Sequence, residues 1–136
     1  MMDQKEFRRA CYEAARRTAG AVKEFQHSYY APNFDQCHIA YPHRTVAVLW
    51  TRDWGRNATW HGLGVAATPV EYGSLTFVDE PGLLAVLKEL LPACRVFTRA
   101  ELEGPLDQAE WPWVDEDDVR YWRPDNLGEA LFNHWD

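Results

Sequence analysis

Apolar residues recur at helical spacing in the first part of the chain. Between Asp3 and Gln26 they fall three, four or seven positions apart, and basic side chains lie mostly on other faces. These apolar positions are Phe7, Cys11, Ala14, Val22 and Phe25. Gly20 weakens a helix by up to ~1 kcal/mol relative to alanine, so a bend or an end near it is expected. The pattern predicts one N-terminal helix over Asp3–Gln26.

Two β-rich runs follow a tyrosine-rich loop. Gln36–Tyr41 and Arg44–Arg52 are joined by Pro42-His43, which predicts a hairpin. The second run is apolar at both alternating sets of positions, with Val46, Val48 and Trp50 in one set and Ala47 and Leu49 in the other. Such a strand is typical of the centre of a sheet that is covered on both sides.

The middle of the chain alternates between clear and unclear signals. Asp53–Pro69 has no clear register, because Gly62 and Gly64 argue against long regular structure, although Thr59-Trp60 favours the start of a strand. The next segments predict a short strand over Gly73–Glu80, a helix that begins at Pro81 and ends before Pro92, and a strand over Ala93–Thr98. The strand order does not follow from these patterns.

Capping signals mark two helices in the last third of the chain. Thr98 and Glu101 have the spacing of a capping box, and Asn126 repeats this signal before a final helix. An edge strand is expected between them, around Val119–Trp122.

The final helix predicts a docked C-terminal tail. Leu127, Leu131 and Trp135 recur every four residues and form a one-sided apolar stripe. Trp122 is expected to continue this stripe into the core, and Phe132 lies off the stripe and is expected to be left over.

Together these elements predict an α+β fold. The expected architecture is a mainly antiparallel sheet of about four to six short strands with helices packed on it, including an N-terminal and a C-terminal helix. With 136 residues, 46% of them apolar, the chain is long enough for one core, so residues 1–136 are expected to form a single domain.

Cysteine use and apolar run lengths predict a cytoplasmic protein. Cys11, Cys37 and Cys94 are odd in number and far apart, which favours reduced thiols over a disulfide framework. No apolar run approaches the roughly 20 residues that span a bilayer, and the charged N-terminus does not have the pattern of a secretory signal. No membrane association is expected.

Charge is distributed unevenly along the chain. Residues 1–68 carry nine Lys/Arg and six Asp/Glu, a net charge of +3, whereas residues 69–136 carry five and fifteen, a net charge of −10. Glu101–Asp118 contains eight acids and no base. Such a field repels nucleic acid and attracts basic surfaces, so a nucleic-acid partner is not expected.

No metal or cofactor is predicted. The densest group of metal-binding side chains is Cys37, His38 and His43, which lacks a second pair at ligand spacing. Cys37 and His38 would also point to opposite faces of a strand. The phosphate-binding glycine motifs are absent.

One alternative function is a small hydrolase or transferase that uses Asp53, His61 or Cys37. Cys37 is the best candidate nucleophile, His61 is expected to be an exposed base, and Asp53 follows a buried strand, where sites are often placed. No nucleophile motif supports this function, and a turn role for Asp53 is the simpler one. Enzymatic activity is therefore uncertain and not favoured.

The strongest functional signal is an acidic stretch that also carries tryptophan. Trp111 and Trp113 precede the four acids Asp115, Glu116, Asp117 and Asp118. Aromatic anchors beside charge of one sign are typical of protein-binding hot spots, although use of both tryptophans in the core is an equal competitor.

These patterns favour a non-enzymatic protein-binding domain. The expected partner is a protein with a basic surface that meets the acidic, tryptophan-bearing C-terminal half. In size, acidity and tryptophan content the chain is similar to small bacterial immunity and inhibitor proteins, an analogy that assigns no role to any residue. A structural or scaffolding module is the third alternative.

Overall fold

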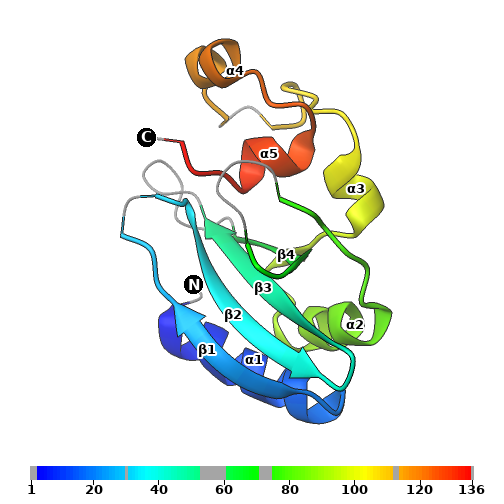
Figure 1. Ribbon diagram of the computed structural model, residues 1–136. Helices are drawn as coiled ribbons and strands as arrows, with labels where there is room; N and C mark the ends of the chain where they lie inside the picture. The colour runs from blue at the N-terminus through cyan, green and yellow to red at the C-terminus, as the bar shows by residue number, and fades with distance from the viewer. Residues whose placement is uncertain (1–2, 30, 53–60, 71–74, 112–113, 136) are drawn as a thin grey trace.

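Helices cover both faces of a single sheet (Figure 1). The computed structural model describes residues 3–29, 31–52, 61–70, 75–111 and 114–135. Within them the helices are α1 (Gln4–Arg17), α2 (Pro81–Leu90), α3 (Arg99–Glu103), α4 (Glu116–Trp122) and α5 (Leu127–Leu131). The strands are β1 (Ala21–Gln26), β2 (Phe34–Tyr41), β3 (Arg44–Arg52), β4 (His61–Ala67) and β5 (Arg95–Val96). The predicted α+β class is confirmed.

The sheet has the order β1-β2-β3-β4-β5. The pairs β1–β2, β2–β3 and β3–β4 are antiparallel, and β5 runs parallel to β4. The predicted hairpin is confirmed, since Tyr41 pairs with Arg44 across the turn at Pro42 and His43. Its second strand, β3, lies in the middle of the sheet, so both of its faces must be covered.

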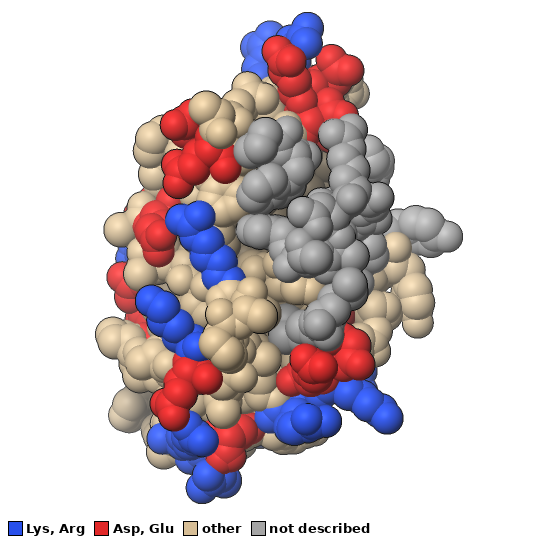
Figure 2. Space-filling model, turned by 180° about the vertical axis from the view of Figure 1, so that it is seen from behind, with Lys and Arg blue, Asp and Glu red and all other residues tan. Residues whose placement is uncertain are grey.

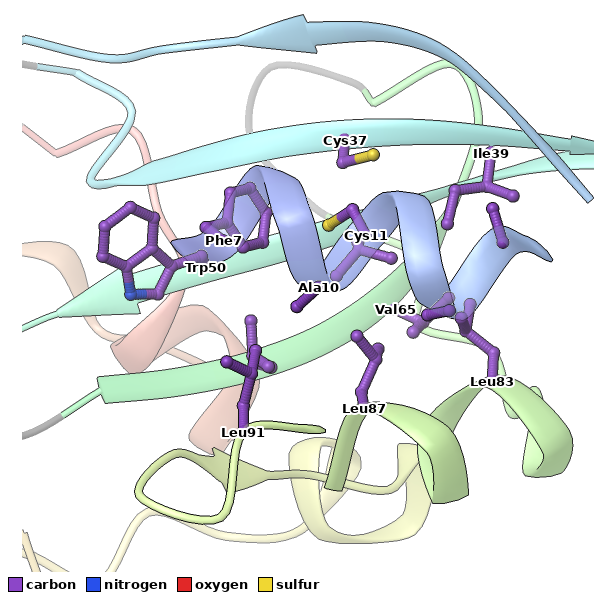
Figure 3. Close-up of a cluster of buried hydrophobic side chains, with 14 of the residues drawn as sticks. Phe7, Ala10, Cys11, Cys37, Ile39, Trp50, Val65, Leu83, Leu87 and Leu91 are labelled. Atoms are coloured by element: carbon purple, nitrogen blue, oxygen red, sulfur yellow. The ribbon is translucent and has the colours of Figure 1, made fainter. Parts of the chain in front are cut away.

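One face of the sheet packs against α1 and α2 (Figure 3). Alternate residues of β3 contribute to this cluster, including Val48 and Trp50. Phe7 of α1 packs its ring 5.2 Å from the ring of Trp50, and Leu87 of α2 is fully buried. The other alternate residues of β3, Ala47 and Leu49, belong to a second cluster on the opposite face. The two-sided apolar pattern of β3 is therefore explained by two separate cores.

The second core is built largely by the C-terminal third of the chain. Leu102 of α3 and Leu127 and Leu131 of α5 are buried there with Trp111 and Phe132. A Cβ atom at Gly64 of β4 would lie 3.0 Å from Cδ1 of Leu102, so the glycine lets α3 approach the sheet closely. The expectation that Gly62 and Gly64 interrupt regular structure was wrong, because β4 runs through both.

The predicted N-terminal helix over Asp3–Gln26 was too long. Helix α1 ends at Arg17, where the Thr18 hydroxyl donates to the carbonyl oxygen of Ala14 at 2.8 Å. Ala19 then adopts a left-handed conformation with φ of 60°, and the chain reverses into β1. Val22 and Phe25 reach the first core from this strand because a β-bulge between Val22 and Glu24 changes the alternation. The bulge produces a three-residue spacing that resembles a helical one.

Two predicted strands also differ from the structure. In Gly73–Glu80, whose first two residues lie outside the described part, only Phe77 forms a bridge, with Ala66. Val119–Trp122 is not an edge strand but the end of α4, because the Asp115 side chain accepts from the backbone N–H of Asp117 and caps a helix. Acids in the first turn further favour the helix. The capping box at Thr98, the N-cap at Asn126 and the α2 boundaries were predicted correctly.

The C-terminal tail is docked, as the sequence predicts. Asn33 and Asn133 hold it by reciprocal bonds: the Asn33 N–H donates to the Asn133 carbonyl at 2.9 Å, and the Asn133 N–H donates to Asn33 Oδ1 at 2.8 Å. Phe132 is not left over, because α5 ends at Leu131 and extended backbone turns the Phe132 ring into the second core. It packs 6.1 Å from Phe34 and 5.9 Å from Phe77.

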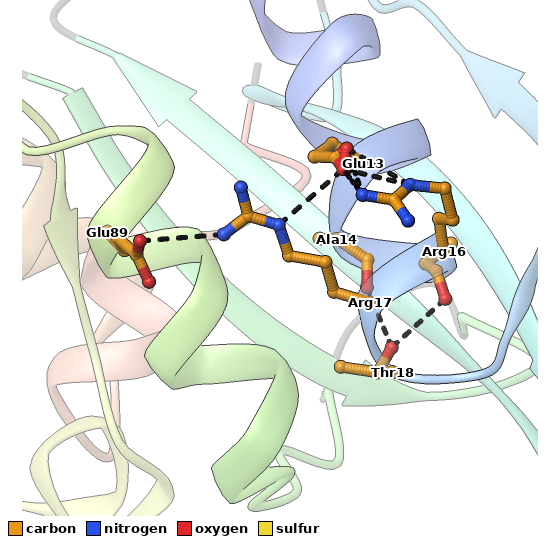
Figure 4. Close-up of polar contacts among 7 residues, drawn as sticks. Glu13, Ala14, Arg16, Arg17, Thr18 and Glu89 are labelled. Carbon is orange, nitrogen blue, oxygen red and sulfur yellow. Dashed lines mark hydrogen bonds and ion pairs between the residues drawn. The ribbon is translucent and has the colours of Figure 1, made fainter.

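A cross-helix ion pair joins the two helices on the first face (Figure 4). Arg17 of α1 lies between Glu13, one turn before it, and Glu89 of α2, with nitrogen–oxygen distances of 3.5 Å to each. All of these side chains are partly exposed, so the pairs contribute little to stability.

None of the described helices has both the length and the apolar character required to cross a membrane.

Candidate functional site

The acidic stretch forms a surface helix. Helix α4 is the uppermost helix in Figure 1, and none of its residues is buried. Asp115 caps its N-terminus and Glu116, Asp117 and Asp118 form its first turn, so the four predicted acids are brought together at one end of one helix. All four residues are exposed. The helix is thus stabilised locally, by its cap and by acids near its N-terminus, and contributes little to the core.

Arg120 partly neutralises the negative charge at the start of this helix. Arg120 lies one turn after the acids, 3.6 Å from a carboxylate oxygen of Glu116 and 3.4 Å from one of Asp117. Slight burial raises the pKa of Asp118, and the neighbouring charges of Asp115 and Asp117 raise it further. The smaller part of this rise, caused by Asp115 and Asp117, is a repulsion that a cation approaching this turn would relieve. In the view from behind, both acidic and basic side chains lie at the upper end of the molecule (Figure 2).

Exposed aromatic side chains lie at the other end of α4. Tyr121 is 78% exposed and Trp122 is 38% exposed, so the expected burial of Trp122 in the core was wrong. The Trp122 ring stacks on Trp135 with a centroid distance of 5.9 Å and an interplanar angle of 3°. Tyr121 packs edge-on against Trp122 at 4.9 Å. We call the acids Asp115–Asp118 with these three aromatic residues the α4 surface.

Trp111, one of the two sequence-predicted tryptophan anchors, is not part of this surface. The Trp111 ring is only 2% exposed and packs 5.7 Å from Phe97 in the second core. The guanidinium carbon of Arg95 lies 4.8 Å from the ring centroids of both. The competing core role is therefore favoured for Trp111. Trp113 lies outside the described residues. Sequence reasoning missed the exposed Tyr121 and Trp122 and the partly buried Trp135 that stacks on Trp122, because it expected a strand and a longer helix there.

The residues proposed for the alternative enzyme are mostly buried. His61 is only 4% exposed, contrary to the expectation of an exposed base, and its Nδ1 accepts a hydrogen bond of 3.1 Å from Trp50 Nε1. Cys37 is fully buried beside Cys11. Burial of Cys11, together with its hydrogen bond to Cys37, raises the pKa of the Cys11 thiol well above its usual value. Asp53 lies outside the described residues. The positions of His61 and Cys37 disfavour nucleophilic chemistry, because the thiolate is the reactive form and needs access.

A second polar group, which the sequence did not reveal, lies at the start of β2. His27 Nδ1 is 2.8 Å from Oδ2 of Asp35, whose side chain is almost fully buried. The other carboxylate oxygen of Asp35 accepts from the backbone N–H of Ser28 at 3.0 Å. His27, Ser28 and Tyr29 line an adjacent cleft of about 280 Å³. No sequence motif joins His27 with Asp35. The only signal in the sequence was a histidine before a loop and an acid near the start of the strand that follows it.

Metal binding finds no support in the described part of the chain. No three of its histidine, cysteine, aspartate and glutamate side chains lie close enough together to hold an ion. Cys37 is buried, whereas His43 lies exposed in the β2–β3 turn. The cluster of Cys37, His38 and His43 seen in the sequence is therefore not brought together as a set of metal ligands.

Similarity to known proteins adds no information about the α4 surface or about the cleft beside His27. Comparisons with protein-family models, curated proteins and solved structures give no significant match to this chain.

Proposed function

We propose that the protein is a cytosolic, non-enzymatic protein-binding domain of the inhibitor or immunity type, whose α4 surface binds a basic partner protein. One observation carries the proposal: α4 has no buried residue, yet it places four acids and the exposed aromatics Tyr121 and Trp122 on one short helix. A helix that contributes so little to the core has another use for large aromatic side chains.

The two ends of the α4 surface have different physical roles in this proposal. Exposed charges act over about 8 Å at physiological ionic strength, so Asp115–Asp118 attract a basic partner before contact. Tyr121 and the Trp122–Trp135 stack then offer large rigid rings, which are enriched in binding hot spots. Acids beside aromatic anchors suit a basic protein surface better than nucleic acid, because phosphates would be repelled.

The experiment begins with capture of the partner from the native host and its identification by mass spectrometry. Binding of the purified pair is then measured by surface plasmon resonance at two salt concentrations. Changing Asp115, Asp117 and Asp118 to asparagine and Glu116 to glutamine should mainly slow association and weaken its salt dependence, since steering acts on encounter. Trp122→Ala should mainly speed dissociation, by about 30-fold if the ring is a hot spot of about 2 kcal/mol.

A matched control separates local steering from total charge. Changing the four exposed acids Glu6, Glu89, Glu103 and Glu110 to glutamine alters the net charge by the same amount but leaves the acids of α4 in place. This variant should associate at nearly the original rate. Equal slowing by both quadruple variants would reduce the effect to net charge, and a partner that ignores α4 and Trp122 altogether would refute the proposed surface.

A further inference from the structure

A small cleft lies where β1 leaves the sheet and β2 enters it. It has a volume of about 280 Å³ and is lined by residues of the β1 end, of the loop after it and of the β2 start. This volume is near the lower limit of small-molecule sites, about 300 Å³, so the cleft fits one side-chain-sized group. Apolar walls come from Ala31, Pro32 and Phe34, and polar groups come from Gln26, His27, Tyr29 and Gln36.

The tautomer of His27 is set by a buried carboxylate behind it. Asp35 is 3% exposed and accepts from the backbone N–H of Ser28, so both of its oxygens have hydrogen-bonding partners on this loop. Because a carboxylate can only accept, His27 Nδ1 must carry the proton that lies between them. In the neutral ring Nε2 is then a hydrogen-bond acceptor. His27 also lines the cleft, so its ring brings an accepting nitrogen to the cleft wall while its other nitrogen is bonded to the Asp35 carboxylate.

The other cleft groups also favour a cation. Among the described residues that line the cleft, none is lysine or arginine. Gln26 donates its amide Nε2 to Glu24 at 3.4 Å, which leaves Oε1 as its accepting end. Tyr29 is 77% exposed and packs edge-on against the His27 ring at 4.6 Å, so it offers an aromatic surface at the mouth. A cation near such a ring is stabilised by its quadrupole.

Gln36 provides one feature of opposite character. Its Oε1 lies 2.9 Å from Nε2 of His38 and accepts from that ring, so its Nε2 is the end that can donate into the cleft. His38 itself lies 3.5 Å from Glu24. Two carboxylates, Asp35 and Glu24, therefore lie beside the two histidines of this wall. With the histidines counted as neutral, these groups carry a net negative charge, which would repel an anion.

We propose that this cleft binds a guanidinium or primary ammonium group, which donates to His27 Nε2 and Gln26 Oε1 beside the Tyr29 ring. Resting on the proposed function, the source of that group is an arginine or lysine side chain of the basic partner. The cleft then adds a pocket for a single cationic side chain to the broader electrostatic attraction of the α4 surface. A cationic side chain of the partner held in the cleft by two hydrogen bonds specifies one partner residue, which exposed acids alone cannot do.

The inference is tested by following backbone and glutamine side-chain amide signals by NMR during titration with ethylguanidinium chloride, and with sodium propionate at equal ionic strength. Ethylguanidinium should shift signals of residues 26–36, including the side chains of Gln26 and Gln36, in a saturable way. Propionate should leave these signals in place. Saturable shifts with propionate instead, or with neither probe, would overturn the inference.

Two charge-matched variants locate the effect. His27→Lys still offers the Asp35 carboxylate a hydrogen-bond donor but replaces the accepting ring with a positive charge, so it should reduce ethylguanidinium binding at least about tenfold. His43→Lys adds the same charge in the exposed β2–β3 turn and should bind the probe almost as the unaltered protein does. If His27→Lys fails to fold, Tyr29→Ala removes only an exposed ring and should weaken binding by about threefold. Unchanged binding in the folded variant would refute the site.

Two further measurements distinguish the source of the cation and the fate of the proposed function. A capped Gly-Arg-Gly peptide should bind the cleft at least as tightly as spermidine, whereas tighter binding of spermidine would reject a protein side chain as the source. Signals of α4 are followed in the same spectra. If a basic partner shifts the signals of α4 but not those of residues 26–36, the cleft inference fails while the proposed function stands. If it shifts the signals of residues 26–36 but not those of α4, the proposed α4 surface fails while the cleft inference stands.

Discussion

Gly128→Ala tests directly whether the C-terminal tail is packed as tightly as the structure shows. Gly128 is buried in α5, and a Cβ atom there would lie 2.3 Å from Cε2 of Phe77 and 3.0 Å from the carbonyl oxygen of Leu102. The carbonyl belongs to the backbone and cannot turn aside. The Phe77 ring is 3% exposed and packs 5.9 Å from Phe132, so it has little room to rotate away. An added methyl group therefore forces α5 away from Phe77 and α3.

The magnitude follows from two opposing effects. Overpacking a well-packed core costs about 1–3 kcal/mol, whereas replacing a helical glycine by alanine gains up to ~1 kcal/mol. We expect Gly128→Ala to lower the free energy of unfolding by about 1–2 kcal/mol, measured by urea unfolding with tryptophan fluorescence. The dependence of that free energy on urea concentration should not change, because the folded and unfolded states expose similar surfaces in both proteins.

Gly82→Ala is the matched control, since it makes the same substitution in another helix. Gly82 lies at the start of α2, where the nearest atom to an added Cβ would be Thr18 Cγ2 at 3.9 Å, an ordinary contact. This change should be neutral or stabilising by up to ~1 kcal/mol. The two substitutions should therefore have opposite signs. If Gly128→Ala stabilises the protein as much as Gly82→Ala does, the close packing of α5 against Phe77 and α3 is refuted.

Three further changes test other parts of the fold by the same unfolding assay. Leu131→Ala should cost about 2–5 kcal/mol, because this side chain is only 4% exposed in the second core; a cost below about 1 kcal/mol would contradict tail docking. Ala19→Gly should stabilise the protein by about 0.5 kcal/mol, because the strain of the left-handed conformation at φ 60° exceeds the entropic cost of glycine. A loss of stability would contradict the conformation of the α1–β1 turn. Hydrogen bonding to the Thr98 N–H lowers the pKa of Glu101 below its usual 4.5, so its stabilisation is fully present above pH 4.5 and is lost as pH falls through the lowered pKa. Glu101→Gln should accordingly be less stable than the unaltered protein at pH 7 and match it in acid.

Elements with local signals were predictable from sequence. The capping box at Thr98 and the proline at the start of α2 act within a few residues, so they need no knowledge of the rest of the fold. The central position of β3 was predictable for a different reason: a strand that is apolar on both faces is stable only where both faces are covered. In each case the residues that make the sequence pattern are the same residues that stabilise the element.

Elements determined by tertiary pairing were not predictable. The bulge in β1 exists only in relation to its neighbour β2, and it gives Val22 and Phe25 a spacing that also fits a helix. Likewise, the glycines of β4 weaken a strand in isolation but allow close approach of α3 in the fold. Phe132 could not be assigned to the core, because its direction depends on where α5 stops.

The candidate site shows the same division. Four consecutive acids predicted an exposed charged surface, and the structure places all four, exposed, at the N-terminal cap and first turn of α4. The role of the tryptophans depended on the fold: Trp111 entered the second core, while Trp122 stayed at the surface. His27 and Asp35 are eight residues apart on opposite sides of a loop, and nothing but the folded loop brings them together.

The docked tail connects both proposed binding regions to the stability of the protein. Asn133 is bonded to Asn33, which lies in the loop between two residues that line the His27 cleft, Pro32 and Phe34. Two residues after Asn133, Trp135 stacks on Trp122 of the α4 surface. The same short segment therefore supports the cleft on one side and the aromatic end of α4 on the other. Because α4 buries no residue of its own, its position depends on contacts of this kind, and loosening the tail would disturb both regions before it unfolded the sheet.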